Sequence, residues 1–339
     1  MQTLEIEVLV ELLECVAKLD KTSPDVTNPR VGWSTDTQLK FIEDLVVVDM
    51  NDPATYAEIC RRAWSSISLS SGMDEIEALL ELAIFNAERR VSPGDPERKD
   101  ILLSTIAELS TVIFSLPKGT RKMRCKSLLE YHSGVFYNDY GRYDFAAEAH
   151  GRGAQEAERL GDTAGVAISR FLEVFYGLKY MLCVGQSDNQ LNTGFIFLEI
   201  KFNELTEALR GTSLEVQWAE HNCPAHMIQA CTWLGINHAK WDEWVKTTLA
   251  AAKKRGCESG SDLICALDLA RRNSPKAVNA LYSVIKQDND NERIATAYLA
   301  LARYFLAHDA KNKAIELVDN MPRQGAQHIR AIVEKLLAD

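Results

Sequence analysis

Apolar residues recur every three or four positions along most of the chain, which is the spacing of one face of an α-helix. In "MDEIEALLELAIFNAERR", residues 73–90, such a stripe includes Ile76, Leu79 and Ala83. Acidic residues lie in the first turn of this segment and arginines in its last, which matches the helix dipole. The best strand candidate, "LVVVDM", continues a helical pattern without a break. The pattern therefore predicts an all-α fold.

Small residues are interleaved with aromatic ones in "YHSGVFYNDYGRYDFAAEAHGRG", residues 131–153. Two antiparallel helices approach closely where one of them supplies small side chains, and Gly134 and Ala146 are placed to do so. Gly141 ends the first helix, because glycine tolerates the left-handed conformation that closes many helices. Tyr137 and Tyr143 would fill the space beside the crossing. The segment predicts a tightly packed helical hairpin.

This order of residues resembles the tetratricopeptide repeat, which places small, aromatic, turn-glycine, aromatic and small residues at these steps. A second segment, "ATAYLALARYFLAHDAKNKAIELVDNMP", matches the same pattern, and the resemblance extends more loosely over residues 121–339. It implies an α-α superhelix of antiparallel helix pairs, since single repeats of this kind bury their apolar face only against neighbours. The residues that match in the second segment are Tyr298, Leu301, Ala302, Phe305, Ala314 and Val318.

The irregular segment at residues 117–120 predicts a division of the chain. Residues 1–116 would form an N-terminal helical region of degenerate helix pairs, and residues 117–339 would form the repeats. The last helix, in "QGAQHIRAIVEKLLAD", carries Arg330 and Lys335 on a charged face and fits a solvent-facing cap.

In the resembling family, the first helix of each unit lines a concave groove that binds a peptide. Carried onto this chain, the groove residues are Tyr131, Asn138, Ser169 and Arg303, and the amide of Asn138 could hold a peptide backbone. The function implied is a protein–protein interaction scaffold or adaptor whose partner is another protein or a peptide. A regulatory sensor that binds a small peptide or metabolite is the alternative, and an enzyme with a non-obvious site comes third.

Charge and composition restrict the partners further. The chain has 339 residues and a net charge of -10, which opposes binding to nucleic acid or anionic lipid in the absence of a local basic patch. Its apolar runs are much shorter than the roughly 20 residues of a membrane span. The acidic N-terminal pattern is unlike a secretory signal. We therefore expect a cytoplasmic protein with buried, reduced cysteines, and self-association is left open.

One basic cluster stands out in "PKGTRKMRCK". Positive charge at the start of a helix opposes the helix dipole, so the cluster is either a solvated turn or a site for phosphate or an acidic partner. The sequence leaves both interpretations open. Its members are Lys118, Arg121, Lys122, Arg124 and Lys126.

Candidate chemistry is sparse. Phosphate-binding and nucleophile-elbow patterns are absent from the sequence. His221, Cys223, His226 and Cys231 could ligate zinc, but their spacing matches no closed ligand set, and we expect Cys223 in a loop with both histidines partly exposed. Among the tryptophans, Trp233 and Trp241 are predicted to be core and Trp244 partly exposed. The sequence thus predicts neither an enzyme nor a bound metal or cofactor.

Overall fold

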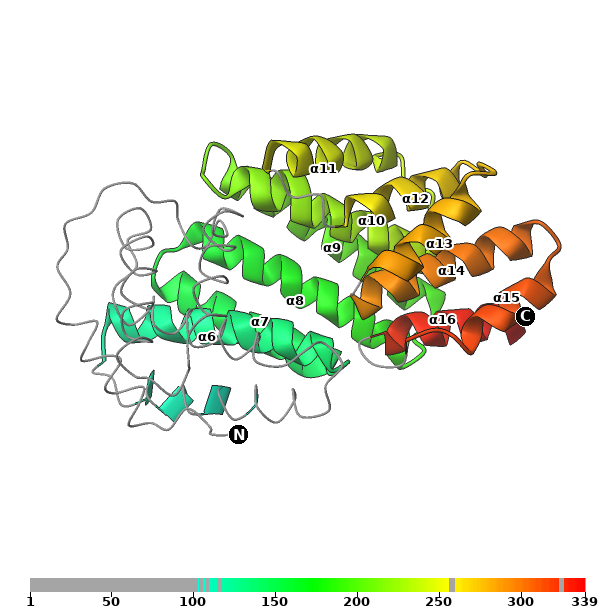
Figure 1. Cartoon of the computed structure of the whole chain (residues 1–339). Helices are drawn as coiled ribbons and strands as arrows, with labels where there is room; N and C mark the ends of the chain where they lie inside the picture. Colours follow the sequence, from blue (N-terminus) through cyan, green and yellow to red (C-terminus); the bar gives the residue numbers. More distant parts are fainter. Residues whose placement is uncertain are drawn as a thin grey trace, which may run out of the picture. The chain divides into compact units, whose positions relative to one another are not determined.

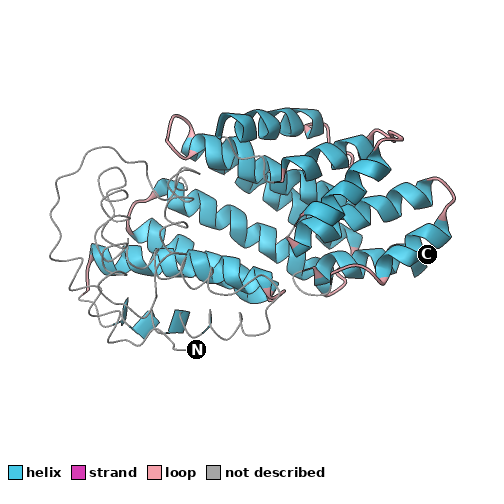
Figure 2. Cartoon of the chain, in the orientation of Figure 1, coloured by secondary structure: helices cyan, strands magenta, loops and turns pink. Residues whose placement is uncertain are grey.

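The computed structural model describes residues 118–255, 260–288, 290–322 and 326–338, together with residues 103, 106, 107, 110, 111, 113 and 114. These residues form helices joined by turns and loops, with no strand among them (Figure 2). The all-α prediction is confirmed for this part of the chain. The helix predicted at residues 73–90, and nearly all of the predicted region 1–116, lie outside the described residues.

The described helices follow one another with short connections (Figure 1). Glycines in the left-handed conformation close several of them, and Asp290 caps another by accepting a hydrogen bond from the backbone N–H of Arg293 at 2.9 Å. In chain order the elements are α6 (Thr120–Asp139), α7 (Tyr143–Arg159), α8 (Thr163–Cys183), α9 (Asp188–Leu209), the π-helix η2 (Glu215–Asn222), α10 (Cys223–Leu234), α11 (Trp241–Arg255), α12 (Ser261–Arg271), α13 (Ala277–Gln287), α14 (Asn291–Ala307), α15 (Lys311–Val318) and α16 (Gln327–Ala338).

The chain separates into two compact units. Unit 1 comprises Met1–Ser133 and Arg152–Val166, and unit 2 comprises Gly134–Gly151 and Ala167–Asp339. Within unit 1, α6 and α7 are joined by the ion pair of Arg152 with Glu130, at 2.8 Å. The division predicted at residues 116 and 117 stays a prediction.

The hairpin of α6 and α7 forms as its small residues predict. Gly141 has φ +69° and follows the end of α6, and its N–H donates to the carbonyl of Asn138 at 2.9 Å. Gly134 faces His150 so closely that a Cβ on it would lie 2.3 Å from His150 Nε2. His150 is buried there and stacks on Tyr176, with ring centroids 5.1 Å apart. Gly134 therefore leaves room for a neighbouring side chain, as expected of a helix crossing.

Unit 2 packs consecutive helices against one another and also joins helices far apart in the sequence. Neighbours from α10 to α15 pack in order, whereas α14 also contacts α10, α12 and α16. At the N-terminal end of α16, His328 is buried and its Nδ1 lies 2.8 Å from the Tyr143 hydroxyl. The superhelical repeat arrangement stays a prediction.

The burial or placement of three residues differs from the prediction. Trp244 is buried, because its ring stacks on His238 with centroids 4.6 Å apart and meets Phe202 edge to face. Cys223 does not lie in a loop but begins α10 and is buried, whereas Cys265 on α12 is exposed rather than buried. Among the described helices, none has both the length and the apolar character needed to cross a bilayer.

Candidate functional site

A buried lysine is the centre of a polar cluster inside unit 2. Lys179 lies on α8, and its side chain is 1% exposed. Its Nζ donates to Oδ1 of Asn138 on α6 at 2.7 Å and to Oε2 of Glu292 on α14 at 2.5 Å. An ammonium group buried with a carboxylate and an amide acceptor has partners for two of its three donors. We call Lys179, Asn138 and Glu292 the lysine cluster.

Aromatic rings surround the ammonium group of this cluster. The Nζ atom lies 4.7 Å from the ring centroid of Phe175 and 4.9 Å from that of Tyr176, both on α8. Trp233 on α10 and Tyr143 on α7 contribute further rings, at 5.5 and 5.6 Å. Ring faces within about 6 Å attract a cation electrostatically. The cluster therefore holds its charge by an ion pair and by four aromatic side chains.

Burial shapes the titration of the cluster. It lowers the pKa of Lys179 and raises that of Glu292, because it disfavours each charged form, and the short contact between the two side chains opposes both shifts. Burial and the nearby charge of Lys179 also lower the pKa of His226 on α10 to about 4. The same two causes hold the pKa of His328 well below its usual range. Both histidines are therefore neutral at neutral pH.

The final helix is fixed against the cluster through His328. The imidazole meets the rings of Tyr143 and Trp233 edge to face, with centroids 4.9 and 4.6 Å away. Gln327 Oε1 accepts a long hydrogen bond, at 3.4 Å, from the Tyr143 hydroxyl. The cluster and its surrounding rings thus bring together side chains of α6, α7, α8, α10, α14 and α16.

This geometry favours a structural role for the lysine. A lysine of lowered pKa can act as a nucleophile, but only where a substrate reaches its nitrogen. Lys179 is enclosed by four rings and by its two polar partners, so a substrate would reach Nζ only if a helix moved away. The arrangement instead orients α6, α8 and α14, because each polar partner must meet the ammonium group to avoid an unpaired buried charge.

The predicted groove residues are not free to meet a peptide together. The side-chain oxygen of Asn138 is bonded to Lys179, and Ser169 is buried. Arg303 donates from Nη2 to the backbone oxygen of Trp233 at 2.9 Å, and burial lowers its pKa to about 10. Tyr131 belongs to unit 1, where it is half-buried beside His132. Internal hydrogen bonds and burial thus occupy three of the four positions.

Some of the predicted basic residues also have partners within unit 1. Lys122 donates to the backbone oxygen of Phe114 at 2.5 Å and lies over the ring of that residue, and Lys126 pairs with Glu156 at 3.8 Å. Lys118 is exposed at the N-terminal side of α6, whereas Arg124 is half-buried. Arg121 lies in the first turn of the same helix. The choice between a solvated turn and an anion site stays open.

The two histidines among the possible zinc ligands each have a hydrogen-bond partner of their own. Nδ1 of His221 lies 2.8 Å from Asn222 Oδ1, and Nδ1 of His226 lies 3.4 Å from Gln229 Oε1. Burial raises the pKa of the Cys231 thiol to about 12, which disfavours the thiolate that a metal needs. In the described part of the chain, no group of three or more histidine, cysteine or acidic residues is placed to hold a metal ion.

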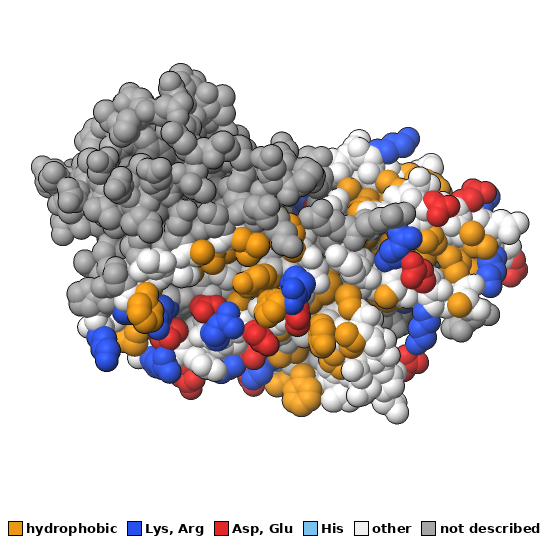
Figure 3. Space-filling view, turned by 90° about the horizontal axis from the view of Figure 1, so that it is seen from below, with side chains coloured by type: hydrophobic (Ala, Val, Ile, Leu, Met, Phe, Trp, Pro, Cys, Tyr) orange, Lys and Arg blue, Asp and Glu red, His pale blue; other side chains and the backbone are white. Residues whose placement is uncertain are grey.

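An exposed apolar strip lies on α9. Ile196, Phe197 and Ile200 are 56%, 53% and 44% exposed, at helical spacings that place them side by side. On the opposite face of the same helix, Phe195 and Leu198 are buried. We call Ile196, Phe197 and Ile200 the α9 strip. Figure 3 shows one face of the molecule, on which exposed apolar side chains are interspersed with charged ones.

Comparisons of the chain with protein-family models, with curated proteins and with solved structures found no match.

Sequence reasoning missed both the lysine cluster and the α9 strip. One signal for the first was a single lysine inside the apolar segment "FLEVFYGLKYMLC", at helical spacing from Phe175 and Leu182. The signal for the second was the run "FIFLEI", in which apolar residues occupy both faces of one helix. An amphipathic surface helix carries them on one face only.

Proposed function

We propose that the chain is a protein–protein interaction scaffold that binds a protein partner through the α9 strip. The observation that carries the proposal is the exposure of Ile196, Phe197 and Ile200 on one turn and a half of a single helix. Exposed apolar side chains that gather on one surface are a common property of interaction sites. Single exposed apolar residues are ordinary, but three adjacent large ones on a well-packed helix are not.

The strip contributes little to the packing of its own helix. Phe195, Leu198, Phe202 and Leu205 are buried on the inner face of α9 and anchor it. A polar residue at each strip position would satisfy the helical pattern equally well. The apolar side chains therefore fit a role outside the packing of this chain, and binding a partner would remove them from water.

The lysine cluster supports the scaffold role indirectly. It fixes the helices of unit 2 relative to one another, so the elements beneath α9 are held by buried polar contacts. A rigid surface loses less conformational entropy when it binds than a mobile one. A protein built this way presents a preformed surface to its partner.

A photo-crosslinking experiment tests the proposal. A photoreactive phenylalanine analogue replaces Phe197 in the full chain, and the same analogue replaces Tyr282, an exposed aromatic residue on α13, as a matched control. The chain is expressed in its own cells and irradiated. We expect protein adducts, either to another protein or to a second copy, at position 197 and much weaker ones at position 282. Equal labelling at the two positions, or none at 197, would overturn the proposal.

A variant separates binding from folding. Phe197→Glu places a charge in the strip without touching the inner face of α9, so the thermal unfolding temperature should change little. The partner captured by the wild-type chain should be lost. If Phe197→Glu retains the partner at full yield, the strip is not the contact surface.

A further inference from the structure

We infer that the partner of the α9 strip is a second copy of this chain, packed through α9 in an antiparallel, two-fold symmetric pair. This inference rests on the proposed function and names its partner. It is carried by the order of exposed residues along α9. The strip is the middle of a longer exposed face of α9. Toward the N-terminal end of the helix this face carries only uncharged residues, and toward the C-terminal end it carries acidic ones. Its members, all exposed, are Asn189, Asn192, Thr193, Ile196, Phe197, Ile200, Asn203, Glu204 and Glu207.

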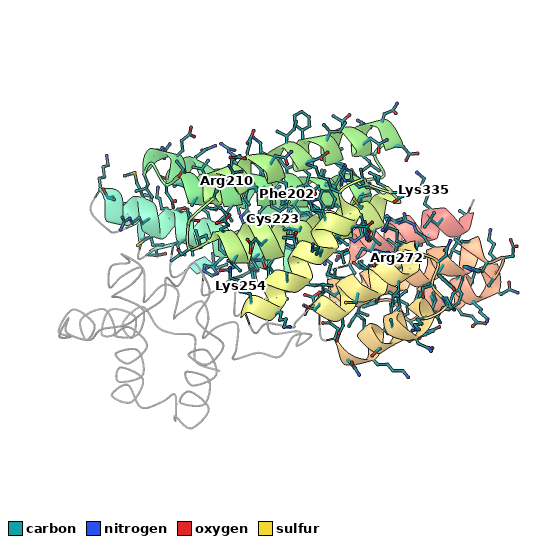
Figure 4. All side chains as sticks on the ribbon, turned by 90° about the horizontal axis from the view of Figure 1, so that it is seen from above. Phe202, Arg210, Cys223, Lys254, Arg272 and Lys335 are labelled. Atoms are coloured by element: carbon teal, nitrogen blue, oxygen red, sulfur yellow. The ribbon has the colours of Figure 1, made fainter. Side chains whose placement is uncertain are left out.

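Charges beside the strip are already paired within the chain. Lys201 pairs with Glu204 at 2.7 Å, and Arg210 pairs with Glu207 at 2.7 Å. The chain as a whole carries a net charge of -10 and would repel a copy of itself at most surfaces. These exposed ion pairs reduce the repulsion that a second copy would meet at the strip, but they leave the carboxylates partly uncompensated. Figure 4 labels Phe202, on the C-terminal half of α9, and Arg210, which directly follows the helix.

The direction of the second helix follows from the acidic end. In a parallel pair, Glu204 and Glu207 would each lie beside the same residue of the second copy, and like charges would oppose one another. In an antiparallel pair centred at the level of Leu198, Ile196 meets Ile200 of the second copy. Glu207 then lies opposite Asn189 of that copy, and Glu204, which lies on one flank of the face, is opposite Thr193 on the same flank.

The antiparallel arrangement matches acceptors with donors. A carboxylate accepts hydrogen bonds, and an asparagine side chain offers an amide N–H₂ group. An isologous interface repeats each such contact, because residue i of one copy meets residue j of the other and the reverse. Two apolar contacts, two carboxylate–amide contacts and two carboxylate–hydroxyl contacts then lie along one helix of 22 residues. The strip is complementary to itself in this register and in no parallel one.

Analytical ultracentrifugation of the full chain over a range of concentrations tests the inference. We expect a monomer–dimer equilibrium, which Ile200→Glu weakens by at least about tenfold because it charges the centre of the contact. Tyr282→Glu, which charges an exposed aromatic residue on α13, is the matched control and should leave the equilibrium unchanged.

Two substitutions at Asn189 test the register. Asn189→Glu places a carboxylate opposite Glu207 of the second copy and should weaken the dimer, whereas Asn189→Lys places an ammonium group there and should strengthen it. Neither variant alters the buried face of α9, so circular dichroism should remain that of the wild-type chain. If both substitutions shift the equilibrium in the same direction, the antiparallel register is wrong.

The outcome also separates this inference from the proposed function. A chain that stays monomeric, or a dimer insensitive to Ile200→Glu, overturns the second copy as partner. If crosslinking from position 197 then captures a different protein, the proposed function stands with another partner. If it captures none, both fail.

Discussion

The ion pair of Lys179 and Glu292 allows a quantitative test of what holds unit 2 together. Replacing Lys179 by methionine keeps an unbranched side chain that is one atom shorter and removes the ammonium group, which leaves the largely buried Glu292 without its counter-charge. Breaking one side of a buried pair typically costs about 3–5 kcal/mol of unfolding free energy. We expect Lys179→Met to fall in that range.

The magnitude follows from two opposing effects. At the 2.5 Å separation of Nζ and Oε2, the attraction is about 7 kcal/mol at an effective dielectric constant of roughly 20. Desolvation of the two ions costs several kcal/mol for each. The pair as a whole is therefore close to neutral, and the double variant Lys179→Met/Glu292→Met should be much closer in stability to the wild-type chain than either single variant.

Denaturant unfolding followed by amide hydrogen exchange in α8 and α14 measures this double-mutant cycle, because exchange reports on unit 2 by itself. The partly exposed pair Lys201–Glu204 provides the control, and Lys201→Met should cost at most about 1 kcal/mol. If the two single substitutions in the lysine cluster add without coupling, or if Lys179→Met costs no more than Lys201→Met, the cluster does not fix the helices as argued.

Two further measurements test other parts of unit 2. Gly134→Ala should destabilise the chain by about 1–3 kcal/mol, because the new methyl group would overlap the ring of His150. Gly177→Ala, at a position with open space around it, should instead stabilise α8 by up to about 1 kcal/mol. Thermal unfolding of both variants measures the difference, and equal changes in unfolding temperature would refute the close helix crossing at Gly134. Because the pKa of His226 is about 4 in the folded chain and 6.5 when unperturbed, the unfolded chain binds more protons between these values, so stability is fully present above pH 6.5 and falls by about 3 kcal/mol at most as the pH drops to 4. Denaturant titrations should show that His226→Phe removes part of this dependence, and an unchanged profile in His226→Phe would contradict the assignment.

The sequence pattern was sufficient to predict the helices and one close helix crossing. The spacing of apolar residues predicted the helices that the described residues form, and Gly134 and Gly141 predicted a close crossing and a turn between α6 and α7. These features depend on residues near one another in the chain, where periodicity and backbone preference act directly. The resemblance to the tetratricopeptide repeat and the groove stay predictions.

Contacts between residues that are far apart in the sequence could not be predicted in the same way. Lys179 and Glu292 are 113 positions apart, and a single lysine in a helix gives no indication of which acid it will meet. Asn138 was predicted to hold a peptide, but the fold uses its side chain to hold Lys179. Trp244 was predicted to be partly exposed from its neighbour Lys240, but the packing of Phe202 and His238 decides its burial.

The contact of α16 with the start of α7 has a consequence for folding order. His328 and Tyr143 are separated by 185 positions, so their hydrogen bond closes a very long segment of chain. The entropy of closing so long a loop must be offset by contacts formed in between, which places this docking late on the folding pathway. In a linear array of repeats the terminal unit can detach alone, but here its release uncovers Tyr143 and Trp233 as well. Unit 2 should therefore lose its structure in one concerted transition rather than unravel from its final helix.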